Sequence, residues 1–120
     1  GALIQLALEW CEKHNVSRVF ESAGGDVLAP RVLPGRTHVF HKYVVRARDR
    51  EAFRAAMEAA GVPTLVHYAT GLHRQPVFAH AAPADCPGTD ALAERVCSLP
   101  IHAFLTEDEV ARVADALAQA

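Results

Sequence analysis

The chain has 120 residues and a mass of 12.9 kDa, which is the size of one domain. Hydrophobic residues make up 51% of it and charged residues 22%, a balance that predicts a folded core rather than extended disorder. Twelve Lys and Arg against fourteen Asp and Glu give a net charge of −2, so a nucleic-acid-binding surface is not expected. No apolar run approaches the roughly 20 residues that cross a bilayer, and the first ten residues lack a basic start, so neither a membrane span nor a signal peptide is expected.

Three cysteines, Cys11, Cys86 and Cys97, are odd in number and widely spaced, and none forms a CxxC pair. This pattern predicts buried or incidental thiols rather than a disulfide framework. It also indicates a reducing compartment, so we expect a cytoplasmic protein. A Cys–His nucleophile pair stays open as an interpretation, because residues far apart in sequence can be neighbours in space.

The first third of the chain predicts a helix followed by turns. Residues 2–14 carry an apolar stripe at helical spacing, which either covers the local sheet or packs on something outside the chain. Residues 15–36 contain Gly and Pro at several turn positions, with a short strand at residues 19–20. The apolar stripe of residues 2–14 consists of Leu3, Ile4, Leu6, Ala7, Leu8, Trp10 and Cys11.

Residues 37–46 are rich in β-branched and aromatic side chains and contain no Gly or Pro, which predicts a strand. Because side chains alternate along a strand, one face would carry one set of four residues and the opposite face the other set. The first set is Val39, His41, Tyr43 and Val45, and the second is Phe40, Lys42, Val44 and Arg46.

A helix is expected next, with Asp49 as its N-cap and Gly61 just beyond its end. Its apolar stripe would consist of Phe53, Ala56, Met57 and Ala60. Residues 62–66 suggest a second strand, with Pro63 keeping its start at an edge or a bulge. Strand, helix and strand in this order predict an α/β fold, more narrowly an α+β two-layer sandwich in which helices cover one face of a small, mainly antiparallel sheet.

The last third begins with a connection over residues 67–88, which is long enough to suggest a functional loop. Thr89 is a candidate cap for a helix over residues 90–97, with Leu92 and Val96 facing inward. Thr106 and Glu109 form a capping-box pattern before a final amphipathic helix. The inward residues of that helix would be Val110, Val113, Ala114 and Leu117.

The loop over residues 67–78 is the part of the chain richest in side chains that could bind a ligand. It combines histidines, a tyrosine and Gln75, which suit a polar, sugar-like or phosphate-bearing ligand, although a solvated surface loop would have the same composition. A metal site is not expected, because His67, His73 and His80 are six and seven residues apart and structural zinc ligands usually pair at two to five. The sequence also contains no HExxH, GxGxxG or GxxxxGK[ST] motif.

Four short stretches occur in order over residues 35–120. They are residues 35–46; a helix ending in Gly61-Val62-Pro63-Thr64; the loop His67-Tyr68 with Leu72-His73-x-Gln75-Pro76-x-Phe78; and Ser98-Leu99-Pro100 with Leu105-Thr106-x-x-Glu109-Val110. Together they resemble the C-terminal domain of the DegT/DnrJ/EryC1/StrS aminotransferases. Their order and spacing make the resemblance specific.

The sequence departs from the family pattern in three places. Ala69 stands where the family usually has proline, which bears on loop rigidity and substrate choice. Residues 1–34 match the family pattern only loosely, and their opening helix would correspond to the family's inter-domain helix. We therefore expect the chain to divide into an N-terminal helix and irregular connection at residues 1–34 and an aminotransferase-like small domain at residues 35–120. The large domain that binds pyridoxal phosphate (PLP) in this family has no counterpart in the sequence.

The resemblance implies a role in PLP-dependent amino transfer from a glutamate-type donor to a keto-sugar carried on a nucleotide. In such enzymes a lysine of the large domain holds PLP covalently, and neither Lys13 nor Lys42 matches it. No catalytic or cofactor-binding residue, and no covalently bound PLP, is therefore expected in this chain. The implied substrate-binding residues are His67, nearest the sugar nucleotide, and Tyr68 and His73, which would support the loop or simply pack it.

Two classes of function follow from the resemblance. In the first, the chain is the C-terminal domain or a truncated form of such an aminotransferase and contributes the substrate-side wall of its active site. In the second, it is a non-catalytic binding or assembly module, either a homo-oligomer such as a dimer, associating through the opening helix and the Val39/Tyr43 face, or the complement of a separate large-domain chain.

Overall fold

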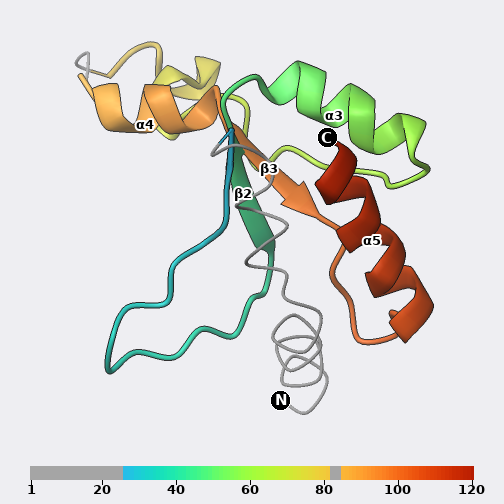
Figure 1. The fold of residues 1–120 in the computed structure, drawn as a ribbon. Helices are drawn as coiled ribbons and strands as arrows, with labels where there is room; N and C mark the ends of the chain where they lie inside the picture. The colour runs from blue at the N-terminus through green and yellow to red at the C-terminus, as the bar shows by residue number, and fades with distance from the viewer. Residues whose placement is uncertain (1–25, 82–84) are drawn as a thin grey trace.

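The computed structural model describes residues 26–81 and 85–120. The predicted helix at 2–14 and the strand at 19–20 lie outside these residues. Within them are three strands, three α-helices and two short 3₁₀ turns (Figure 1). In chain order they are β1 (Val27–Leu28), β2 (Tyr43–Ala47), α3 (Arg50–Ala59), η1 (Leu72–Arg74), η2 (Pro76–Phe78), α4 (Pro87–Ala93), β3 (Val96–Leu99) and α5 (Glu107–Gln119).

The three strands form one antiparallel sheet in the order β1-β2-β3. Val45 of β2 lies opposite Cys97 of β3, and Val27 of β1 lies opposite Ala47. Helix α3 contacts β2, β3 and α5, and Figure 1 shows α3 and α5 on the same side of the sheet. This confirms the predicted fold class, a small antiparallel sheet with helices on one face.

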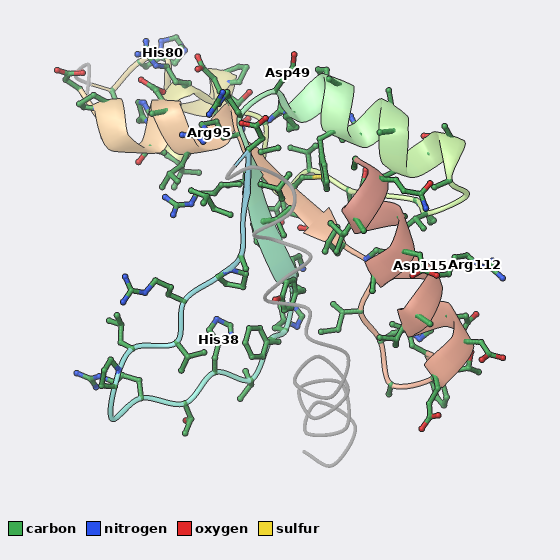
Figure 2. All side chains as sticks on the ribbon, viewed as in Figure 1. His38, Asp49, His80, Arg95, Arg112 and Asp115 are labelled. Carbon is green, nitrogen blue, oxygen red and sulfur yellow. The ribbon has the colours of Figure 1, made fainter. Side chains whose placement is uncertain are left out.

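The core lies between the sheet and these two helices. Val45, Met57 and Cys97 have the largest fully buried side chains, and burying a side chain of the size of valine or methionine contributes about 1.5–3 kcal/mol. Arg112 and Asp115 of α5 are exposed and point away from the sheet (Figure 2). The other buried members of the core are Val27, Ala47, Phe53, Val62, Leu99, Ala116 and Leu117.

Strand β2 starts later than predicted, at Tyr43 instead of residue 37. The cause is Phe40, whose φ of 45° lies in the left-handed region and interrupts the extended backbone. Its backbone N–H donates to His38 Nδ1 at 2.8 Å, and its ring stacks on those of His38 and Tyr43. Val39 is consequently 71% exposed while Tyr43 packs against the core, so the prediction that Val39 and Tyr43 share one face is wrong.

Helix α3 has the predicted limits. Asp49 accepts a hydrogen bond from the backbone N–H of Ala52 at 2.9 Å, and Gly61 adopts the left-handed conformation, with φ of 74°, just beyond the helix. Phe53 and Met57 are buried, as expected for the apolar stripe.

The strand predicted at residues 62–66 is reduced to one residue pair. Leu65 and Ser98 exchange backbone hydrogen bonds of 3.1 and 2.7 Å at the outer edge of β3. Pro63 has no N–H to extend this pairing. The chain therefore touches the sheet edge at Leu65 and then leaves it.

The helix predicted over residues 90–97 is misplaced. Helix α4 begins at Pro87 with Cys86 as N-cap, so Thr89 does not cap it, and Leu92 is 45% exposed. Residues 96–99 form β3 instead, because Val96, Cys97, Ser98 and Leu99 pair with β2. Pairing with a distant strand here overrides the local helical spacing.

Strand β1 was not predicted, and it lies in the segment assigned to an irregular N-terminal connection. It is hydrogen-bonded to β2, so the sheet joins residues on both sides of the expected boundary at 34/35. The division into residues 1–34 and 35–120 stays a prediction.

The final helix, α5, is capped as predicted. Thr106 Oγ1 accepts from the Glu109 N–H at 3.3 Å, and the Thr106 N–H donates to Glu109 Oε2 at 2.8 Å. The Glu109 carboxylate accepts from the Thr106 N–H and also from the Thr106 hydroxyl at 3.0 Å, and these two hydrogen bonds hold the pKa of Glu109 below its usual value.

The substitution Thr106→Ala should lower the free energy of unfolding by about 1 kcal/mol, because it removes the cap of α5. Thr89→Ala, at the position that the sequence wrongly suggested as a cap, should change it by less than about 0.5 kcal/mol. Urea denaturation of both variants checks this. Equal effects of the two substitutions would contradict the assigned caps.

Candidate substrate-facing site

The loop that carries the predicted site residues leaves the sheet next to β3. The Leu65–Ser98 pairing holds its start, and His67 follows two residues later. His67 Nδ1 lies 3.0 Å from the Oγ of Ser98, whose side chain belongs to a residue only 5% exposed. His67 itself is half-buried, so one ring edge is held against the strand.

Tyr68 lies beside His67 and faces outward. The peptide bond between them is cis, and the two rings meet edge to face with centroids 5.5 Å apart. Tyr68 is 72% exposed, so most of its ring and its hydroxyl are accessible. His67 and Tyr68 thus form one surface at the edge of the sheet.

His73 lies in a different setting, against helix α4. Its side chain is 10% exposed, and Nε2 is 3.0 Å from Asp90 Oδ1, within ion-pair distance but without the alignment of a hydrogen bond. Arg74 binds the same carboxylate through two nitrogens, at 2.7 and 3.3 Å. The Arg74 hydrogen bond is the main reason that the pKa of Asp90 lies below its usual value, with the charges of Arg74 and His73 adding to it.

Gly71 allows this close approach of the loop to α4. A Cβ at this position would lie 2.7 Å from Cε1 of His73 and 2.8 Å from Cγ2 of Thr89. Among the described residues, no hydrogen bond, ion pair or ring contact joins His73 to His67 or Tyr68. The three predicted residues therefore fall into an outward-facing pair and a separate anchor.

Sequence reasoning missed the partners of these residues. In the sequence Ser98 stands out only as part of a family motif, and nothing marks Asp90 or Gly71 for a role. Ser98 meets His67 through strand pairing, and Asp90 meets His73 and Arg74 across 16 or more residues of chain. No local sequence signal marks these contacts, because each joins residues that are far apart in the chain.

The substitution Asp90→Asn should release the loop over residues 71–78 from α4 while leaving the sheet intact. Faster amide exchange at residues 72–78, with unchanged exchange in β2, would show this by hydrogen–deuterium exchange. Exchange as slow as in the wild type would contradict the anchoring role.

The same anchor should depend on pH. The pKa of Asp90 is lowered in the folded state, so its stabilisation is complete above the unfolded value of about 4 and is lost as the pH falls through the folded value. The wild-type loop should therefore approach the behaviour of Asp90→Asn at acidic pH and differ from it near neutrality.

The described residues hold no cluster of metal ligands, and Cys97 is poorly placed to act as a thiolate. No three or more His, Cys, Asp and Glu side chains among them come together as metal ligands. Cys97 is fully buried, and burial raises the pKa of its thiol, which opposes thiolate formation. Within the same residues, no helix is long and apolar enough to cross a membrane.

The described residues also do not fit a covalent PLP site. Such a site needs a lysine amine enclosed in a pocket. Lys42 is the lysine in the described ranges, and its Nζ contacts His41 Nε2 at 3.2 Å on an exposed segment. No step through PLP is therefore assigned to these residues.

The chain is similar to solved structures of aminotransferases. The sugar aminotransferase CalS13 from Micromonospora echinospora is similar with a TM-score of 0.74 and 26% identity, over 96% of this chain and 30% of that one. DesV from S. venezuelae, solved in complex with a ketimine intermediate, has a TM-score of 0.72 and 30% identity, over 84% of this chain and 28% of that one. The fold is thus that of one part of a sugar aminotransferase.

The family follows from sequence comparison. The model of the DegT/DnrJ/EryC1/StrS aminotransferase family matches residues 14–118. UDP-N-acetyl-3-dehydro-alpha-D-glucosamine 3-aminotransferase of Acidithiobacillus ferrooxidans is 36% identical over 108 residues, which are 90% of this chain and 27% of the relative. UDP-2-acetamido-2-deoxy-3-oxo-D-glucuronate aminotransferase of Pseudomonas aeruginosa is 40% identical over 88 residues, 73% of this chain and 24% of the relative.

The chain belongs to the DegT/DnrJ/EryC1/StrS aminotransferase family, which confirms the resemblance noted in the sequence. It spans about a quarter of the length of these curated relatives.

Proposed function

We propose that this chain acts as the C-terminal domain of a nucleotide-sugar aminotransferase, whole or truncated, and forms the substrate-side wall of its active site. The reaction would transfer an amino group from a glutamate-type donor to a keto-sugar carried on a nucleotide. The names of the relatives support this substrate class, since the A. ferrooxidans and P. aeruginosa proteins are named for UDP-linked amino-sugar chemistry.

The observation that carries the proposal is the outward-facing pair at the sheet edge. His67 has one ring edge on Ser98 and Tyr68 is 72% exposed beside it. Imidazole and phenol groups donate and accept hydrogen bonds, and an exposed ring offers a face for stacking, which suits sugar hydroxyls and diphosphate oxygens. In this proposal His67 and Tyr68 contact the substrate.

His73 would act indirectly in this proposal. It contacts Asp90 and is 10% exposed, so its role would be to hold the loop against α4 rather than to bind the substrate. Loop position matters for binding because a small displacement of a contact residue costs affinity.

In this proposal the PLP cofactor would be bound by a part of the enzyme outside this chain. PLP is the cofactor of the family, and the solved structure of NtdA from Bacillus subtilis contains the related cofactor PMP. When bound, PLP provides the electron sink for amino transfer. The lysine that holds it would lie in the large domain, not at Lys13 or Lys42.

A chimera tests the proposal. In the A. ferrooxidans relative, the C-terminal quarter would be replaced by residues 14–118 of this chain, the region that matches the family. We expect the chimera to catalyse amino transfer to the relative's UDP-linked keto-sugar, and the relative lacking its C-terminal quarter to be inactive. A folded chimera that binds PLP but not the sugar nucleotide would contradict the proposed function.

A second candidate function is an assembly module, as a homo-oligomer or bound to a large-domain chain. The segment between β1 and β2 supports it, because it extends away from the sheet (Figure 1) and exposes Leu33 at 60% and Val39 at 71%. Light scattering would distinguish a monomer from a dimer.

The cytoplasmic location of the protein stays a prediction.

A further inference from the structure

We infer that Ser98 is a positioning residue for His67: its hydroxyl donates to Nδ1 and so fixes the neutral imidazole as the tautomer with the proton on Nε2. The inference rests on the proposed function in one respect, namely that the Nε2–H group would donate a hydrogen bond to the substrate. The tautomer itself follows from the hydrogen bonds available at the edge of β3.

The Ser98 hydroxyl belongs to a residue that is almost out of contact with water. Ser98 is 5% exposed, and its backbone N–H and C=O are both used in the pairing with Leu65. A hydroxyl has one O–H donor and can also accept. Among the described residues, His67 Nδ1, at 3.0 Å, is the hydrogen-bond partner of the Ser98 Oγ.

The two neutral tautomers of His67 differ in whether they leave the Ser98 O–H with an acceptor. If Nδ1 carried the proton, it would donate to Oγ, and the buried O–H of Ser98 would have no acceptor among the described residues. Leaving a buried donor unpaired is costly. If the proton is on Nε2, Oγ–H donates to Nδ1 and both groups are satisfied, so this tautomer is favoured.

The consequence lies at the other edge of the ring. Nε2 makes no hydrogen bond to another described residue, and the exposed ring of Tyr68 lies alongside. With the proton fixed on Nε2, His67 presents a hydrogen-bond donor and no acceptor at that edge. A donor there matches diphosphate oxygens and sugar carbonyl or hydroxyl oxygens, and disfavours groups that can only donate.

Two other histidines provide internal controls. His38 Nδ1 accepts the backbone N–H of Phe40 at 2.8 Å, and His102 Nδ1 accepts that of Phe104 at 3.2 Å. Both should carry their proton on Nε2 for a reason independent of Ser98.

The test is nitrogen NMR of the full ¹⁵N-labelled chain at about pH 8, where imidazoles are mostly neutral, with the His67 signals assigned by His67→Gln. We expect wild-type His67 to show an unprotonated Nδ1 and a protonated Nε2. Ser98→Ala should lower the ratio of the Nε2–H to the Nδ1–H form at His67 by about fivefold or more. Ser98→Thr, which keeps the hydroxyl, should restore the wild-type ratio, and His38 and His102 should not change.

A proton on Nδ1 of wild-type His67, or an unchanged ratio in a folded Ser98→Ala variant, would overturn the inference. If Ser98→Ala does not fold, Ser98→Cys, whose thiol is a weaker hydrogen-bond donor, takes its place, and an unchanged ratio in that variant would overturn the inference as well. This measurement uses no substrate, so a failure of the tautomer assignment is distinct from an inactive chimera, which would count against the proposed function alone.

Discussion

Replacing Val45 by aspartate should unfold the domain. Val45 is fully buried in the middle strand, between the neighbouring strands and beneath α3 and α5. A carboxylate there would lack a partner, and an unpaired buried charge costs more than about 4 kcal/mol. That approaches or exceeds the total stability of a small domain, which is about 5–15 kcal/mol. Loss of the near-ultraviolet circular dichroism signal and of a cooperative urea transition is the expected result.

The matched control is Val39→Asp, the same substitution six residues earlier. The sequence placed Val39 and Val45 on one face of one strand, but Val39 is 71% exposed in the structure. Val39→Asp should therefore change the free energy of unfolding by less than about 0.5 kcal/mol. If both variants unfolded, the late start of β2 at Tyr43 would be wrong.

The substitution His67→Ala should raise the KM for the keto-sugar nucleotide in the chimera by about 10- to 100-fold. A hydrogen bond to a charged group such as a diphosphate contributes about 1.5–3 kcal/mol, which corresponds to that range. PLP binding should be unchanged, because the proposal assigns the lysine and phosphate contacts of PLP to the other domain. Steady-state kinetics together with the absorbance of the bound cofactor separate the two effects.

His80→Ala is the control for this variant. His80 lies in the same loop and is exposed, and Figure 2 shows it near α4, away from the strands. Its replacement should leave KM within about twofold of the unsubstituted chimera. Equal effects at positions 67 and 80 would indicate general loop disturbance instead of substrate contact at His67.

The elements that were predicted correctly are those whose signals are local. Helix α3 has Asp49 at its start and Gly61 after its end, and α5 has the Thr106–Glu109 capping box. Each signal lies within one or two helical turns of the residues it fixes. Sequence alone therefore located both helices that cover the sheet.

The elements that were missed depend on distant partners. Strand β3 forms because residues 96–99 pair with β2, some 50 positions earlier, although their spacing also suits a helix. The late start of β2 depends on the left-handed conformation of Phe40, which is unusual for an aromatic residue. Neither feature has a signal within its own segment.

In the candidate site, too, the sequence predicted what depends on local residues and missed what depends on distant ones. Loop composition and family resemblance drew attention to His67, Tyr68 and His73. Their different environments could not be read from the loop, because Ser98 and Asp90 come from β3 and α4. The roles of these three residues stay predictions.

The most direct measurement is borohydride reduction of the isolated chain after incubation with PLP, followed by peptide mass spectrometry, with the chimera treated in parallel. We expect the chimera to carry one reduced adduct at the lysine of its large domain, and the isolated chain to show no stoichiometric adduct at Lys13 or Lys42. A single stoichiometric adduct at either of these lysines, accompanied by amino transfer from glutamate, would show that this chain holds the coenzyme itself and would contradict its assignment as the substrate-side wall.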